Sequence, residues 1–202
     1  MTAKKGFTLV EVLVSLSIFT MVVVTAVSVL LTMVSASAKA RDIQSIMTNL
    51  SFALDSMTRE IRTGSGYYCQ SGGSSNNLPT VDKPVTGDPF RNCLATESNR
   101  HAFSFIEGGN SITSSCSSKR IGYRYNATDK SIERRLCNGS WYTMTSPDVV
   151  IEDMSFTVTG SSDADSKTPV VTIQLRGKVP GRHGETSELG LQTTVSQYLL
   201  DI

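Results

Sequence analysis

The sequence predicts an α+β fold in which one long N-terminal helix packs on an antiparallel β-sheet, with a loop-rich region that contains disulfides. A helical pattern without Gly or Pro runs from Phe7 to Thr63 and stops at Gly64. Alternating segments typical of strands follow from about residue 101. Between them, residues 64–118 are rich in Gly, Ser, Asn and Pro, which indicates loops.

The first part of the predicted helix, residues 7–34, is apolar on all sides and carries a single charge, on Glu11. At about 1.5 Å per residue it exceeds a bilayer core of about 30 Å, so we expect a transmembrane or filament-core helix. Lys4 and Lys5 precede it, which keeps the N-terminus cytoplasmic and sends the C-terminus outward. A cleaved secretory signal fits less well, because its apolar region is only about 7–15 residues long.

The second part of the helix, residues 35–63, is amphipathic and should lay its apolar stripe on the sheet. The residues of this stripe recur at three- and four-residue spacing: Ile43, Ile46, Met47, Leu50, Leu54, Met57 and Ile61. A separate coiled-coil stalk over residues 43–61 is the alternative, although the segment holds too few heptads for one. The whole helix, residues 7–63, would be about 85 Å long.

Residues 64–202 are expected to form one extracytoplasmic globular domain. Predicted strands cover residues 101–106, 120–125, 131–136, 154–159, 170–179 and 189–199. A hairpin turn is predicted over residues 126–130. In the last strand, one face is shared by Leu189, Leu191, Thr193 and Val195.

The four cysteines predict two disulfide bonds outside the reducing cytosol. Cys116 and Cys137 lie just before and just after the two strands of the predicted hairpin, so antiparallel pairing would bring them together. This favours Cys116–Cys137 and leaves Cys69–Cys93, which is one of three possible connectivities. Zinc is not favoured, because the cysteines form no CxxC pair and only two histidines are present.

Sequence motifs for catalysis or cofactor binding are absent. No P-loop, GxGxxG, HExxH or GxSxG run occurs, so we predict no catalytic residue, no cofactor and no metal site. His101 and His183 lie in unrelated polar surroundings and are expected at the surface. Asp163 and Asp165 lack the spacing of an EF-hand, and a solvated turn is preferred over a calcium site.

Nucleic acid remains a less favoured partner. The net charge of +1 indicates no acidic partner, but basic residues cluster on the predicted hairpin: Lys119, Arg120, Arg124, Arg134 and Arg135. With Tyr123, Tyr125 and Trp141 they form a candidate DNA-binding surface. The preferred interpretation is a solvated hairpin face with the aromatic rings in the core.

The run KKGFTLVEVLVSLSIF resembles the leader and N-terminus of type IV prepilins and of the pseudopilins of type II secretion. The shared features are a basic leader, Gly, Phe, a Thr-Leu-Val/Ile-Glu run and about twenty apolar residues. The resemblance implies that a prepilin peptidase removes residues 1–6 by cutting between Gly6 and Phe7, and then methylates the amino group of Phe7. It also implies the pilin fold.

Glu11 would then be the fifth residue of the mature chain. A carboxylate in an apolar helix is costly unless it is paired, although one near the interface can also snorkel to water. The ammonium group of a neighbouring subunit would neutralise Glu11 and fix the axial register between subunits. Its expected role is therefore assembly.

The helix departs from major pilins, which commonly carry a helix-breaking Gly and Pro where Thr20 and Ser28 stand here. An unbroken helix is more typical of minor pilins and pseudopilins. A less specific resemblance to larger minor pseudopilins covers about eighty residues from Ile121 onward.

The resemblance implies a structural subunit, a minor pilin or pseudopilin, of a type IV pilus or type II secretion pseudopilus. Its expected partners are the prepilin peptidase, other pilin subunits and the inner-membrane assembly platform. It would cross the inner membrane once before assembly into a surface pilus or periplasmic pseudopilus. The alternatives are a pilus-tip binding module, a major pilin and, less favoured, an anchored extracytoplasmic enzyme.

Overall fold

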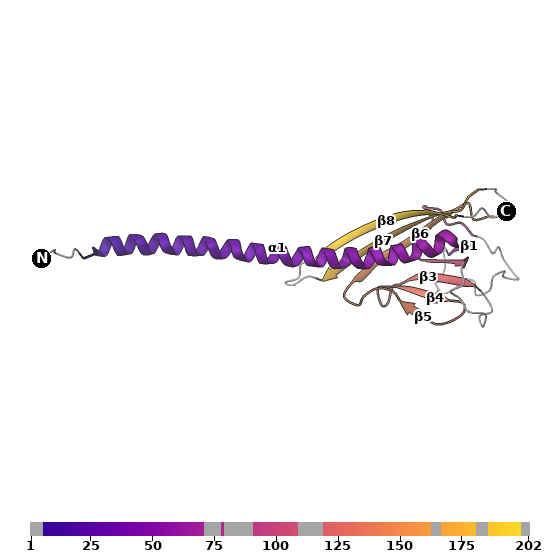
Figure 1. Ribbon diagram of the computed structural model, residues 1–202, viewed down its shortest axis with the longest axis horizontal. Coiled ribbons are helices and arrows are strands. Elements are labelled where there is room, and N and C mark those ends of the chain that lie inside the picture. Colours follow the sequence, from indigo (N-terminus) through magenta and orange to yellow (C-terminus); the bar gives the residue numbers. More distant parts are fainter. Residues whose placement is uncertain are drawn as a thin grey trace. The chain divides into compact units, whose positions relative to one another are not determined.

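The structure is a computed structural model that describes residues 6–70, 78, 91–108, 119–162, 167–180 and 186–198. Within these residues one helix, α1, is followed by the strands β1 to β8 (Figure 1). The chain divides into two compact units, an N-terminal unit, Met1–Arg41, and a C-terminal unit, Asp42–Ile202. Helix α1 contributes to both units.

Helix α1 spans Leu9–Thr63 without interruption, as the absence of Gly and Pro predicts. It ends because Gly64 follows, where an added Cβ would lie 2.4 Å from the ring of Phe105. The last carbonyl groups find donors outside the helix: the Tyr67 hydroxyl donates to Ile61 O at 2.6 Å. The predicted start at Phe7 was two residues too early.

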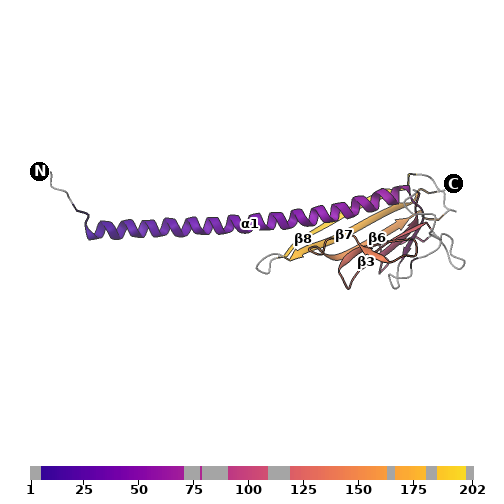
Figure 2. The ribbon, with the colours of Figure 1, turned by 60° about the horizontal axis from the view of Figure 1, so that its bottom comes forward.

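The strands form two antiparallel sheets. The first has the order β1 (Ser65–Gln70), β2 (Ala102–Ile106), β3 (Arg120–Asn126), β4 (Ser131–Leu136) and β5 (Trp141–Thr143). The second has the order β6 (Val150–Thr159), β7 (Val170–Pro180) and β8 (Thr186–Ser196). Figure 2 shows β6, β7 and β8 side by side in the C-terminal unit.

The predicted α+β fold class is therefore confirmed. The number of sheets and two of the strands differ from the prediction. The prediction placed all strands in one sheet, and it missed β1 inside the loop-rich region and the short strand β5. The predicted hairpin is present: Asn126 Oδ1 accepts hydrogen bonds from the backbone of Thr128 and Asp129 and so closes its turn.

The disulfide Cys69–Cys93 helps to join the two sheets. Cys69 belongs to β1, while the backbone of Cys93 exchanges two hydrogen bonds with Val158 of β6, at 2.9 and 3.1 Å. This bond agrees with the predicted pairing. The other predicted pair, Cys116–Cys137, includes Cys116, which lies outside the described residues, so it stays a prediction.

One hydrophobic core lies between the last part of α1 and both sheets. The helix buries a stripe of residues at helical spacing: Ile46, Leu50, Ala53, Leu54, Met57 and Ile61. Against this stripe lie aromatic rings from both sheets: Tyr67, Phe103, Phe105, Tyr123 and Phe156. Since all the buried helix residues lie in the C-terminal unit, residues 9–45 contribute nothing to this core.

Glu60, near the end of α1, connects the helix to the five-stranded sheet. Its carboxylate accepts hydrogen bonds from Arg134, at 2.7 and 3.2 Å, and from the Tyr123 hydroxyl at 2.5 Å. Tyr123 and Arg134 face each other on β3 and β4, so one carboxylate holds two neighbouring strands. The side chains of Arg134 and Glu60 are only 23% and 24% exposed, which limits screening by solvent.

Both donors to Glu60 remain protonated at ordinary pH. Burial, together with the charge of Glu60 and the hydrogen bond to it, raises the pKa of Tyr123 far above its usual value. For Arg134, burial acts to lower the pKa, but Glu60 and Tyr123 outweigh it, and the net pKa is raised. Neither donor therefore loses its proton in the physiological pH range.

Replacing Glu60 should destabilise the C-terminal unit. Glu60→Ala leaves Arg134 without its carboxylate, and we expect a loss of about 2–4 kcal/mol in the free energy of unfolding. The control Asp55→Ala removes the ion pair with Arg59, whose side chains are 68% and 77% exposed, and should cost less than about 0.5 kcal/mol. Urea unfolding of the full chain in detergent, followed by the fluorescence of its single tryptophan, measures both. Equal losses in the two variants would contradict this account.

Candidate assembly site at the N-terminus

The predicted cleavage position lies in non-helical chain immediately before α1. Gly6, Phe7 and Thr8 precede the first helical residue, Leu9. An added Cβ on Gly6 would meet no atom within 4 Å, and Phe7 is 82% exposed. The peptide bond between Gly6 and Phe7 is therefore sterically open, while residues 1–5 lie outside the described part of the chain.

Thr8 caps the start of α1. Its side-chain oxygen accepts a hydrogen bond from the backbone N–H of Glu11 at 3.3 Å, and its carbonyl accepts one from Val12 at 3.3 Å. This is the N-cap arrangement, which satisfies one of the helix's free N–H groups. Sequence reasoning missed Thr8, although Thr-x-x-Glu over residues 8–11 is a helix-start signal that would have placed the start at Leu9.

Glu11 lies in the first turn of α1, where the partial positive charge of the helix end favours a carboxylate. Its side chain is exposed. Among the residues that the structure describes, no hydrogen bond or ion pair of its carboxylate is found, because the only contact at this residue is the backbone N–H bond to Thr8. The described residues therefore supply no charged partner for the Glu11 carboxylate.

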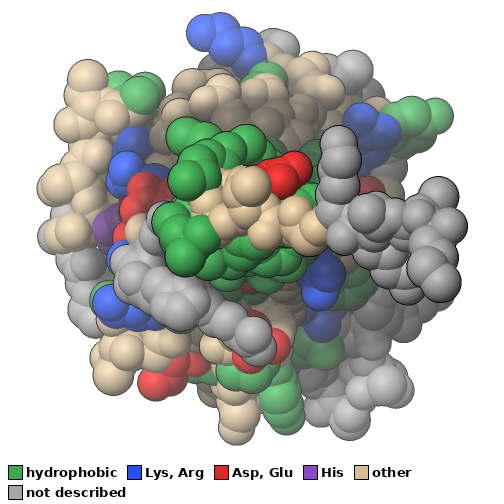
Figure 3. Space-filling model, turned by 90° about the vertical axis from the view of Figure 1, so that its left-hand side faces the viewer, with side chains coloured by type: hydrophobic (Ala, Val, Ile, Leu, Met, Phe, Trp, Pro, Cys, Tyr) green, Lys and Arg blue, Asp and Glu red, His purple; other side chains and the backbone are tan. Residues whose placement is uncertain are grey.

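The rest of the segment presents an apolar surface that the chain does not cover. Every large apolar side chain from Phe7 to Val34 is between 41% and 82% exposed. Figure 3 shows hydrophobic side chains gathered around the helix on the face turned to the viewer. By length and composition, α1 is the single helix of the described residues that could cross a membrane.

Most hydroxyl groups in this surface are hydrogen-bonded within the helix. Each of the following side chains donates to a carbonyl three or four residues earlier: Ser15, Thr20, Thr25, Ser28, Thr32 and Ser35. At Thr20 and Ser28 the helix continues without interruption. The segment can enter an apolar environment without an unpaired hydroxyl at these positions.

The basic residues of the hairpin do not form one free surface. Arg134 faces α1 and binds Glu60, whereas Arg120 is 1% exposed and donates to Gly66 O at 2.8 Å. Arg124 donates to Glu133 at 2.6 Å. These three side chains are engaged in contacts within the C-terminal unit, so most of the predicted DNA-binding surface is not available to a ligand. Tyr123 lies in the core, as expected.

The remaining residues considered for chemistry do not come together. His101 Nδ1 lies 2.7 Å from Met154 O and 3.6 Å from Asp153 Oδ1, and its side chain is partly exposed at the surface of the C-terminal unit. His183, Asp163 and Asp165 lie outside the described residues. Within the described part of the chain, no group of three His, Cys, Asp or Glu side chains could hold a metal ion.

Removing the Thr8 cap should loosen the first turn of α1. Thr8→Val keeps the side-chain shape but loses the acceptor, and we expect about 1 kcal/mol, or about fivefold faster amide exchange at Glu11. The control Thr20→Val removes a hydroxyl that bonds only a carbonyl and should leave exchange at Glu11 unchanged. Hydrogen exchange of the full chain in micelles by NMR measures both, and unchanged exchange in Thr8→Val would exclude the cap.

Comparison with known proteins agrees with this geometry at the N-terminus. Residues 1–27 match the family model described as the prokaryotic N-terminal methylation motif. Searches of curated proteins and of solved structures gave no match. The matched residues include Gly6, Phe7, Thr8 and Glu11, which the structure places at the exposed start of α1. Residues 1–27 thus carry the prokaryotic N-terminal methylation motif, which is the prepilin-type signal of type IV pilin-like proteins.

Proposed function

We propose that the chain is a structural subunit, a minor pilin or pseudopilin, of a type IV pilus or a type II secretion pseudopilus. A prepilin peptidase removes residues 1–6 and methylates the amino group of Phe7. Residues 7–34 anchor the subunit in the inner membrane before assembly. The assembly platform then adds it to a surface pilus or a periplasmic pseudopilus. The C-terminal unit, outside the cytoplasm, supplies a folded domain to the filament.

One observation carries the proposal: directly after Gly6, residues 7–34 expose an apolar, largely helical segment that contains a single carboxylate, Glu11. An apolar surface of this extent is stable only in lipid or against other apolar helices. A pilin-like subunit meets both environments: lipid while it is in the membrane, and other apolar helices in the filament core. The C-terminal unit folds without this surface, which leaves it available.

Glu11 gives assembly its register. Cleavage after Gly6 creates a positively charged amine on Phe7, and the cap at Thr8 fixes Glu11 in the first helical turn. In an apolar surrounding, the carboxylate of one subunit and the amine of its neighbour are each costly alone and favourable together. Only one axial position of the neighbouring helix satisfies both charges.

The unbroken helix favours a minor pilin or pseudopilin over a major pilin. Helix α1, Leu9–Thr63, contains no Gly or Pro, the residues at which a helix most readily kinks or unwinds. A tip-binding role is a second candidate, and it is compatible with the first. An anchored extracytoplasmic enzyme has no observation in its favour.

A larger residue at position 6 should block processing. Gly6→Val adds a branched side chain at the cut bond, and we expect unprocessed precursor to accumulate in the membrane, because the peptidase needs close access to the backbone there. Ala3→Val makes a comparable change elsewhere in the leader and should be processed normally. Immunoblots that resolve precursor from mature chain measure this, and normal processing of Gly6→Val would disprove cleavage after residue 6.

Removing the carboxylate of Glu11 should impair incorporation but not cleavage. Glu11→Ala leaves the neighbour's amine unpaired, and we expect at least about a tenfold loss of the chain from sheared filaments or the pseudopilus fraction. Glu188→Ala, at an exposed position on β8, is the matched control and should assemble normally. The ratio of assembled to membrane-bound mature chain gives the readout. Normal incorporation of Glu11→Ala would refute the pairing role.

A further inference from the structure

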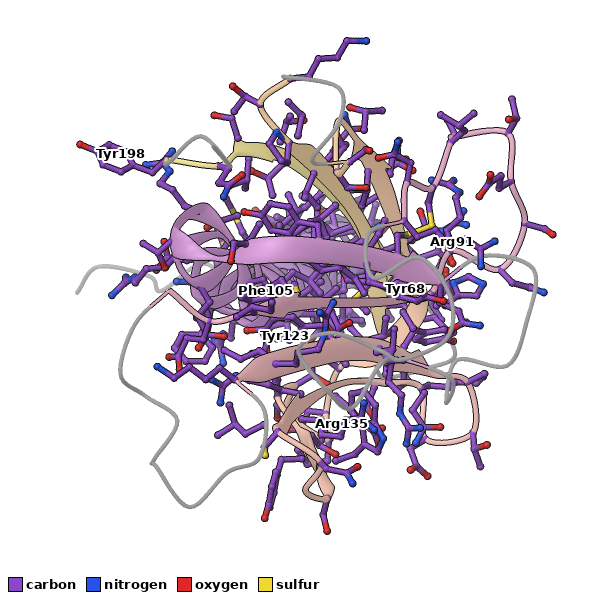
Figure 4. All side chains as sticks on the ribbon, turned by 90° about the vertical axis from the view of Figure 1, so that its right-hand side faces the viewer. Tyr68, Arg91, Phe105, Tyr123, Arg135 and Tyr198 are labelled. Atoms are coloured by element: carbon purple, nitrogen blue, oxygen red, sulfur yellow. A yellow bond between two sulfur atoms is a disulfide. The ribbon has the colours of Figure 1, made fainter. Side chains whose placement is uncertain are left out.

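The face of the five-stranded sheet that points away from Glu60 carries a group of side chains around Trp141. Strand pairing places Gly122 opposite Arg135, Arg124 opposite Glu133, and Arg135 opposite Trp141. We call these five residues the Trp141 cluster. They alternate along β3 and β4 with the residues that bind Glu60, and Figure 4 shows Arg135 farther from α1 than Tyr123.

Trp141 lies against two guanidinium groups. The central carbon of Arg124 is 4.2 Å from a ring centroid of Trp141, and that of Arg135 is 4.7 Å from it. Gly122 makes room for the ring, because an added Cβ there would lie 3.3 Å from Trp141 Cη2. The sheet therefore holds an aromatic ring and two cations within one small area.

The two arginines differ in their partners. Arg124 donates to Glu133 Oε2 at 2.6 Å, and Asn126 donates to Glu133 Oε1 at 2.9 Å, so both oxygens of this carboxylate are already used. Arg135 is only 7% exposed, and its Nε is buried without a hydrogen-bond partner. Within the described part of the chain, its contact with Trp141 is the only polar or aromatic interaction found for it.

A buried cation without an acceptor is unfavourable. Contact with an aromatic ring contributes about 0.5–2 kcal/mol but does not satisfy the N–H groups of a guanidinium. Burial and the nearby charge of Arg124 lower the pKa of Arg135, but an arginine side chain stays charged in proteins. The site therefore holds a positive charge whose buried Nε has no hydrogen-bond acceptor among the described residues.

We propose that Arg135 and Trp141 form a binding site for an anionic group, a carboxylate or a phosphate, that is supplied by a ligand outside the chain. The planar fork of a guanidinium matches two oxygens of either group. Trp141 is half-buried, so the cluster reaches the surface at its ring. The site lies in the C-terminal unit and does not depend on the proposed assembly through residues 7–34.

The chain contains a single tryptophan, so its fluorescence reports directly on this site. The purified full chain in detergent is titrated with sodium phosphate and, separately, with sodium acetate, while sodium chloride keeps the ionic strength constant. We expect a saturable change in Trp141 emission with at least one anion, because an anion that binds Arg135 shifts the guanidinium against the ring. Saturation by phosphate alone indicates a phosphorylated ligand, and saturation by acetate alone indicates a carboxylate.

Three variants connect the signal to Arg135. Arg135→Gln should weaken anion binding at least tenfold, and Arg135→Lys, which keeps the charge but loses the fork, should weaken it severalfold. Arg176→Gln, at an exposed position on β7, should bind as the unmodified chain does. Phosphate or acetate should also raise the thermal unfolding midpoint of the unmodified chain and have no such effect on Arg135→Gln. A change in Trp141 emission no different from that caused by chloride would overturn the proposal. Equal anion affinity in Arg135→Gln and Arg135→Lys would also overturn it.

Discussion

The apolar surface of residues 7–34 is the constraint on which the rest of the molecule depends. The large apolar side chains of this segment are exposed, and none of the described core residues belongs to it. A helix is the structure that suits such a segment, because it satisfies the backbone internally and leaves no polar group for lipid or a neighbouring helix to solvate. Most hydroxyl groups of the segment, such as those of Thr20 and Ser28, donate to carbonyl groups of the same helix. The carboxylate of Glu11 has no such bond within the described chain, and the assembly role proposed for it would supply its partner.

The C-terminal unit is built so that it does not need this surface. The first buried residue of α1 is Ile46. The hydrogen bonds of Glu60 and the Cys69–Cys93 disulfide lie after this residue in the chain. Glu60 holds β3 and β4 to the helix, and the Cys69–Cys93 bond joins β1 to the segment that pairs with β6. The core of the C-terminal unit therefore needs no contact from residues 7–34, as the proposed transfer from a membrane into a filament requires.

Local sequence patterns predicted the elements that depend on local physics. The length of α1 follows from helical spacing and from the absence of Gly and Pro, and the hairpin around Asn126 follows from turn chemistry. Contacts between distant residues were not predictable in this way. Glu60 lies 74 residues from Arg134 and carries no motif that would mark the pair, so Arg134 was assigned to a basic surface. The arrangement of the strands in two sheets also depends on tertiary contacts. The backbone pairing of Cys93 with Val158 of β6 is another such contact that local patterns do not reveal.

The motif of the candidate site could be recognised from the sequence because it consists of consecutive residues, and residues 1–27 match the methylation-motif family. The structure has Gly6 and Phe7 before α1 and Glu11 in its first turn, while the cap at Thr8 was missed. Cleavage after Gly6, methylation of Phe7 and the role of Glu11 in assembly stay predictions. The central claim is that the apolar helix stays on the mature chain. Mass spectrometry of the N-terminal peptide, taken from the chain in membranes and in sheared filaments, tests it directly. The account predicts an N-methylated Phe7 as the first residue in both fractions. A mature chain that begins within residues 35–40, after removal of the apolar helix, would contradict it.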